Sequence, residues 1–172
     1  TAAAIGAGLL VCALHGTRAD EPAIRVSVAA YSFRDGTALE AIEKTRTVGA
    51  DAIEFFLWQK FGGRATTDVV LNQRLSPVGI AELQTALRQN GLRASNAYFN
   101  NTAFRDPATA ETEIRALFEF AKALGLEGLT GEPPPELLDL FERMVQQYDI
   151  ALCFHNHPRK PDRPEYRNWD PE

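Results

Sequence analysis

The sequence is poor in the features that mark several large classes of protein. It has two cysteines, Cys12 and Cys153, and neither lies in a C-x-x-C motif, which argues against a disulfide framework or a cysteine-based zinc finger. Its net charge of −5 does not provide the basic face that nucleic-acid binders carry. We therefore expect a small-molecule ligand and no nucleic-acid partner.

A long apolar run is also missing, although residues 1–19 contain a short one that is rich in alanine. It is too short for a stable membrane span. Small residues at Thr17 and Ala19, followed by Asp20, fit the end of a secretory signal peptide. We expect residues 1–19 to be a partial signal peptide and the protein to be periplasmic or secreted; the alternative is a buried N-terminal helix. Because there is no initiator methionine, we expect the chain to begin inside a longer reading frame.

From Ile24 onward, apolar strand patterns alternate with amphipathic helix patterns. The 172 residues, of which 45% are hydrophobic, are enough for one domain with a substantial core. The patterns predict strands at residues 24–31, 51–57, 92–99, 126–130 and 150–155. Helix starts are expected at the Thr37/Glu40 capping box, at Pro77, at Asp106-Pro107 and at Pro133-Pro134-Pro135, and helix ends at Gly49, Gly91 and Gly125. This order predicts parallel βα units.

The two kinds of connection differ in composition. The helix-to-strand junctions are short and use glycine, whereas the strand-to-helix loops are longer and carry polar residues such as Arg34, Glu132 and the pair His155 and His157. In parallel α/β folds the ligand lies at the carboxyl ends of the strands, where these loops gather. We therefore expect the functional site there.

Two architectures use such units, the doubly wound open sheet and the eight-stranded barrel. Tyr31-Ser32-Phe33-Arg34-Asp35-Gly36, after the first predicted strand, is neither G-x-G-x-x-G nor a P-loop, which favours the barrel. A complete barrel needs about 250 residues. We therefore predict an α/β fold in which residues 20–172 form the N-terminal part of a (β/α)8 TIM barrel, truncated to about the first five strands and four helices.

Two of the three histidines lie at the end of the last predicted strand, in Phe154-His155-Asn156-His157-Pro158. Alternate side chains of a strand point to the same side, so His155 and His157 should face one way and Asn156 the other. Such a pair can direct two imidazole nitrogens at one metal ion. The alternative is two hydrogen-bonded or surface histidines at a strand exit.

Several motifs together resemble the xylose isomerase-like TIM-barrel family of sugar phosphate isomerases and epimerases, especially its secreted bacterial branch. They are Tyr31-Ser32-Phe33-Arg34, Leu124-Gly125-Leu126, Gly131-Glu132-Pro133-Pro134-Pro135, His155-Asn156-His157-Pro158 and Tyr166-Arg167-Asn168-Trp169-Asp170-Pro171-Glu172. The resemblance implies one divalent ion (Mn, Zn, Co or Mg) that binds a sugar or sugar-like substrate. It also implies isomerisation or epimerisation by proton abstraction next to a carbonyl, through an enediolate.

The chain departs from this family at one position. Members often supply a Glu at the end of the fifth strand, and His155 stands there. This exchange lowers the negative charge of the site and favours metals that accept imidazole over Mg²⁺. Two alternative functions stay open: a non-catalytic periplasmic sugar-binding barrel, and a related lyase or hydrolase on oxidised sugars. We expect the 172-residue fragment alone to be inactive, with the last strand unpaired at one edge.

Residues at the predicted strand ends are candidates for each role. For the metal we predict His155 and Glu132, although Glu132 could instead cap a helix dipole. Glu54, in an otherwise apolar strand, and His157 are the candidates for catalysis.

Arg34, Trp58, Tyr98 and Asn156 are the candidates for substrate binding. The ordinary alternatives are an exposed loop arginine, aromatic packing and a side chain that ties its own loop. The sequence does not indicate an oligomeric state.

Overall fold

The computed structural model describes residues 25–158. The expected signal peptide (residues 1–19) and the Tyr166–Glu172 motif lie outside the described residues. Five strands are present: β1 (Ser27–Ala29), β2 (Ala52–Phe56), β3 (Arg93–Tyr98), β4 (Gly128–Gly131) and β5 (Ala151–Phe154). The helices are α1 (Ala38–Thr47), α2 (Pro77–Asn90), α3 (Ala110–Leu124) and α4 (Leu138–Tyr148), with short 3-10 turns η1 (Ala30–Phe33), η2 (Asn101–Phe104) and η3 (Pro135–Leu137). Within residues 25–158, no helix combines the length and the apolar composition that crossing a membrane requires.

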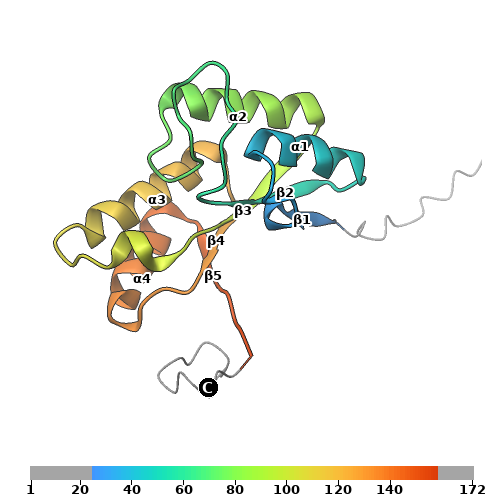
Figure 1. Cartoon of the computed structure of the whole chain (residues 1–172). Helices are drawn as coiled ribbons and strands as arrows, with labels where there is room; N and C mark the ends of the chain where they lie inside the picture. The colour runs from blue at the N-terminus through green and yellow to red at the C-terminus, as the bar shows by residue number, and fades with distance from the viewer. Residues whose placement is uncertain (1–24, 159–172) are drawn as a thin grey trace, which may run out of the picture.

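The strands form one sheet in the order β1-β2-β3-β4-β5, with every neighbouring pair parallel. The four helices within residues 25–158 lie against the same face of this sheet, and none of them lies against the opposite face (Figure 1). A doubly wound sheet has helices on both faces and a point where the strand order reverses. Sequential order with helices on one side is the arrangement of a (β/α) barrel. The predicted fold class is therefore confirmed, as a five-stranded parallel sheet with the barrel arrangement.

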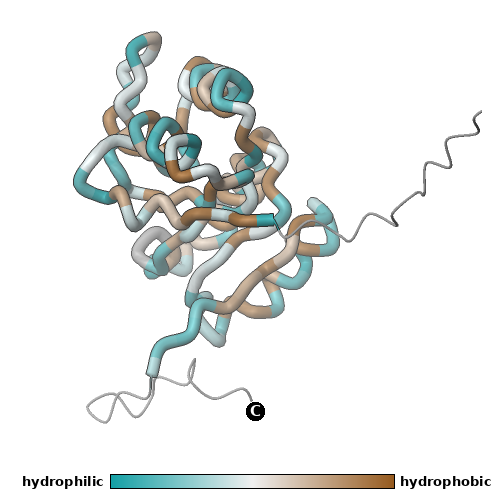
Figure 2. The backbone as a smooth tube through the Cα atoms, turned by 90° about the vertical axis from the view of Figure 1, so that its right-hand side faces the viewer, coloured by the Kyte–Doolittle hydropathy of each residue, from teal (hydrophilic) through white to brown (hydrophobic). Residues whose placement is uncertain are grey.

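The core lies between the sheet and the helices. Ile53 and Phe55 of β2 are fully buried, as are Leu83 of α2 and Phe118 of α3. Each such side chain contributes about 1.5–3 kcal/mol through its removal from water. Figure 2 shows the apolar colouring of β5 giving way to a hydrophilic stretch just after the strand. The alternation along β2 leaves Glu54, between Ile53 and Phe55, on the face without helices.

The ends of the helices follow the sequence signals closely. Thr37 and Glu40 form the predicted capping box at the start of α1. Gly49, Gly91 and Gly125 all adopt positive φ angles, of 79°, 63° and 68°, which a glycine accepts without steric cost.

Several predicted boundaries were wrong, among them the start of β4, which begins at Gly128 and not at residue 126. The first strand is shorter than predicted, because the chain turns into η1 at Ala30, which is buried. Helix α3 begins at Ala110 and not at Asp106-Pro107, since Asp106 accepts the backbone N–H of Ala108 and forms a turn of its own. The proline run does not open α4: Pro134 is extended (ψ 136°), as expected for a residue that precedes another proline.

An irregularity in β3 shapes the inner face of the sheet. The pairing with β2 shifts by one residue between Ile53↔Ala94 and Phe55↔Ala97, so that one extra residue is accommodated. Ala94 and Ala97 are buried on the helix side, and both residues between them are half-buried. Tyr98 consequently emerges on the inner face, at the carboxyl end of the strand.

Candidate metal centre and adjoining cavity

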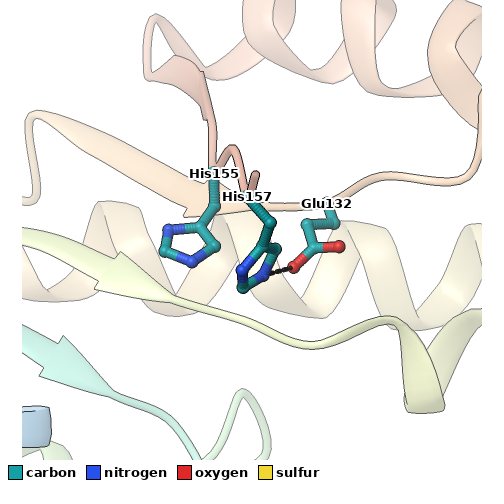
Figure 3. A group of neighbouring side chains, drawn as sticks. All are labelled: Glu132, His155 and His157. Atoms are coloured by element: carbon teal, nitrogen blue, oxygen red, sulfur yellow. Dashed lines mark hydrogen bonds and ion pairs between the residues drawn. The ribbon is translucent and has the colours of Figure 1, made fainter. Parts of the chain in front are cut away.

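Three side chains that could bind a metal converge at the carboxyl ends of β4 and β5. Glu132 follows the last residue of β4, and His155 and His157 follow the last residue of β5. One ligand atom from each side chain lies within 4.8 Å of the others. Figure 3 shows the two imidazole rings and the carboxylate turned toward one another. The parallel pairing of β4 with β5 brings Glu132 and His157, which are 25 positions apart in the sequence, to one place together with His155.

Hydrogen bonds fix the two strand ends relative to each other. The backbone N–H of His155 donates to the carbonyl oxygen of Gly131, at 2.8 Å. Nε2 of His157 lies 2.8 Å from Oε1 of Glu132. The rings of His155 and His157 are nearly perpendicular, at 84°, with centroids 4.7 Å apart. These contacts give the three side chains a defined arrangement.

This donor set suits a borderline divalent cation. Two imidazole nitrogens and one carboxylate oxygen are ligands that zinc sites use, and three protein ligands leave a coordination position open for water or substrate. The three ligand atoms lie within 4.8 Å of one another, so Glu132, His155 and His157 could together hold such an ion.

A cavity of about 510 Å³ adjoins the two histidines on the inner face of the sheet. Its lining combines aromatic rings with a few polar groups, the composition that is usual for small-molecule sites. It is lined by Ala29, Ala30, Tyr31, Glu54, Phe55, Phe56, Tyr98, Asn100, His155 and His157.

No protein-family model matches the chain, and no curated protein sequence matches it either. Solved structures do. An uncharacterised protein from Parabacteroides distasonis superposes with a TM-score of 0.67 at 26% identity, covering 78% of this chain and 53% of that one. A sugar phosphate isomerase/epimerase from the same organism gives 0.55 at 14% identity, with 86% and 59% covered. The IOLI protein, crystallised with a zinc atom, gives 0.55 at 18% identity, with 78% and 53% covered.

The fold is that of a partial TIM barrel. The chain spans between 53% and 59% of the length of these three structures. The likeness in fold agrees with the family resemblance of the motifs. It does not address the secreted branch.

Within the barrel the structure brings together five of the eight predicted site residues. Glu54, Tyr98, His155 and His157 line the cavity, and Glu132 is bonded to His157. Glu54 points to the inner face, as the alternation of β2 predicts, but it is half-buried and not fully buried. Their chemical roles stay predictions.

The other three predicted residues lie outside the cavity lining. Arg34 is exposed, and its guanidinium stacks 4.6 Å from the centroid of the Tyr31 ring. Trp58 adopts a positive φ of 73° and packs against the core. Asn156 is exposed, as expected for the residue between two inward-facing histidines. Their contribution to substrate binding also stays a prediction.

Residues not predicted as site residues also line the cavity, among them Tyr31, Phe56 and Asn100. Phe56 follows Glu54 by two residues, and Asn100 follows Tyr98 by two. The strand period of two could have indicated both, because alternate residues share a face. Tyr31 lies in η1, where no strand period applies.

Tyr98 is influenced by both carboxylates of the site. Burial, together with the negative charges of Glu132 and Glu54, raises the pKa of the Tyr98 hydroxyl above its ordinary value. Like an ordinary tyrosine, the hydroxyl holds its proton at neutral pH, and it can donate a hydrogen bond to an oxygen atom in the cavity.

Proposed function

We propose that the protein is a metal-dependent isomerase or epimerase of a sugar or sugar phosphate, which removes a proton next to a carbonyl and reacts through an enediolate. The observation that carries this proposal is the cluster of Glu132, His155 and His157 at the wall of a cavity that also contains Glu54. The partial barrel fold, shared with a sugar phosphate isomerase/epimerase and with a zinc-bound protein, supports it.

Glu132, His155 and His157 would hold the divalent ion, which we propose to be Zn²⁺, Co²⁺ or Mn²⁺ in preference to Mg²⁺. His157, which the sequence suggests for catalysis, is assigned to the ion because its ring nitrogen lies with the other two ligand atoms. Two imidazole ligands favour the first three metals, because Mg²⁺ prefers oxygen ligands. When bound, such an ion supplies a Lewis acid that stabilises negative charge on a carbonyl oxygen. The cation would also offset the negative charges of Glu132 and Glu54.

The remaining residues of the cavity have complementary roles in the proposed reaction. Glu54 is a carboxylate on the inner face, and we assign to it the transfer of a proton to and from the substrate carbon. The Tyr98 hydroxyl, held in its protonated form, would donate to a substrate oxygen. Tyr31 and Phe56 provide an apolar wall for the carbon skeleton of a sugar.

Metal replacement combined with isotope exchange tests the proposal. The purified protein is stripped of metal, reloaded with Zn²⁺, Co²⁺, Mn²⁺ or Mg²⁺, and incubated with candidate ketoses in deuterated water. We expect deuterium to enter the carbon next to the carbonyl only when metal is present, and Glu54→Gln to reduce exchange by about 10²–10⁴-fold. Glu43→Gln, at an exposed position of α1, is the matched control and should exchange normally.

Two other results would redirect the assignment. Sugar binding without exchange, in a protein that holds metal, would indicate the non-catalytic sugar-binding alternative. No bound metal by elemental analysis and no exchange with any sugar would refute the proposal.

For the location of the protein in the cell, we propose export through the partial signal peptide. Fractionation of cells that express the natural gene would test this.

A further inference from the structure

A row of ring contacts runs across the carboxyl ends of the strands, from η1 to the loop after β5. Tyr31 meets Phe56 edge to face, with centroids 4.9 Å apart. Phe56 stacks with Tyr98 at 5.7 Å. Tyr98 meets His155 edge to face at 5.1 Å and 76°, and His155 in turn meets His157. The aromatic wall of the cavity and the candidate metal ligands are thus one packed unit.

The two histidines of this unit are held in different ways. His157 is bonded to Glu132 through Nε2. Within residues 25–158, the imidazole of His155 packs against the ring of Tyr98 on one side and the ring of His157 on the other. The orientation of the His155 ring therefore depends on the side chains that pack against it. Metal-binding histidines are usually oriented by a hydrogen bond from the second ring nitrogen, and packing takes that place here.

Tyr98 is well suited to orient a neighbouring ring. Its backbone carbonyl accepts from the amide of Leu57, at 3.1 Å, and it pairs with Thr130 in β4, so that its Cα is fixed from both sides. Its own ring lies against Phe56, which leaves one face or edge for His155. Edge-to-face pairs of this kind are favourable beyond the area that they bury.

We infer that Tyr98 is a positioning residue for His155: its ring holds the imidazole in the plane that directs a nitrogen toward Glu132 and His157. This inference rests on the proposed metal site and adds a residue that does not itself bind the ion. It predicts that the ring of Tyr98, and not its hydroxyl, determines metal affinity.

Metal titration of ring variants tests this role. Zn²⁺ affinity is measured by calorimetry against a competing chelator, and the visible absorption spectrum of bound Co²⁺ reports the ligand geometry. Tyr98→Phe keeps the ring and should retain both affinity and spectrum. Tyr98→Leu removes the ring and should weaken Zn²⁺ binding by about 10- to 100-fold, the usual effect of losing a group that orients a ligand, with a changed Co²⁺ spectrum.

The control is Tyr148→Leu, which removes a ring that packs on Phe118 and not on His155; it should leave Zn²⁺ affinity unchanged. If Tyr98→Leu does not fold, Tyr98→Met fills similar space without a planar ring and carries the same expectation. Equal affinity and an equal spectrum in wild type and in the folded ringless variant would overturn the inference. Absence of Zn²⁺ and Co²⁺ binding in the wild type would instead refute the proposed metal site.

Discussion

Nε2 of His157 lies 2.8 Å from Oε1 of Glu132, although the two residues belong to different βα units. The contact links the ends of β4 and β5. The ligand atom of His155 lies within 4.8 Å of those of Glu132 and His157. The side chains are 34% and 23% exposed, so water screens the pair and its own contribution to stability is small. The main effect of the pair is to hold the possible metal-binding atoms of Glu132 and His157 close together.

Glu132→Gln should therefore separate metal binding from folding. The amide keeps the shape of the side chain but removes the negative charge, so we expect Zn²⁺ affinity to fall by about 10-fold or more. The free energy of unfolding should change by only about 0–1 kcal/mol. Chelator competition and urea denaturation measure the two quantities. Glu136→Gln, at an exposed residue of η3, is the control and should change neither the Zn²⁺ affinity nor the free energy of unfolding. An equal loss of Zn²⁺ affinity in both variants would show that Glu132 is not a specific ligand.

The raised pKa of Tyr98 predicts a delayed ionisation in alkaline solution. The difference in tyrosinate absorbance between wild type and Tyr98→Phe should have its midpoint above 10, the ordinary value. Glu54→Gln removes one of the negative charges that hold the proton and should lower this midpoint. Because the folded state holds the proton more tightly, the stability from Tyr98 is present below about pH 10 and is lost as the pH rises further. A midpoint that is unmoved by Glu54→Gln would contradict the proximity of these groups.

Much of the fold was accessible from the sequence because it depends on local patterns. The glycine caps at Gly49, Gly91 and Gly125 follow from the need for a positive φ, and the position of Glu54 on the inner face follows from the strand period. The end of α4 was not predictable in this way. There Asp149 adopts φ 53°, a conformation for which glycine is the usual signal.

Most of the rest depends on contacts between distant segments. The shifted pairing of β3 with β2 places Tyr98 on the inner face, and no period within β3 reveals it. Trp58 packs against the core, and its own backbone adopts a positive φ of 73°, which no sequence pattern indicates. Glu132 and His155, by contrast, directly follow β4 and β5, where the alternation of the strand still indicates the direction of the side chain.

Gly131 lies against an aromatic ring, and Gly131→Ala should test how tightly the end of β4 is packed. A Cβ at this position would lie 2.5 Å from Cζ of Phe99, a fully buried residue, so that the ring must move. We expect a loss of about 1–3 kcal/mol in the free energy of unfolding, measured as a lower urea midpoint. Gly128→Ala, whose Cβ would meet its nearest atom at 3.1 Å, should cost less. Equal losses would show that the Phe99 contact is not the cause.

A clamp of three hydrogen bonds fixes the long loop between β2 and α2. Oδ2 of Asp68 accepts from the backbone N–H of Ser76 (3.1 Å) and from the hydroxyls of Ser76 (2.5 Å) and Thr66 (2.8 Å). Ser76 is also the N-cap of α2, so the carboxylate lies near the positive end of the helix dipole. The hydroxyl of Ser76, followed by that of Thr66, lowers the pKa of Asp68. The Asp68 carboxylate thus accepts hydrogen bonds both from the loop, at Thr66, and from the start of α2, at Ser76.

Asp68→Asn should loosen this clamp and change the acid limb of the stability curve. Because the pKa of Asp68 is lowered in the folded state, its stabilisation is present above the ordinary value of 3.8 and is lost as the pH falls through the folded value. We expect the variant to be about 1 kcal/mol less stable at neutral pH and to lose less stability on acidification. Urea denaturation at several pH values measures both effects. Asp35→Asn, at an exposed residue, is the control. If the free energy of unfolding falls as steeply on acidification in Asp68→Asn as in Asp35→Asn, the Asp68 carboxylate does not cause the loss of stability at low pH.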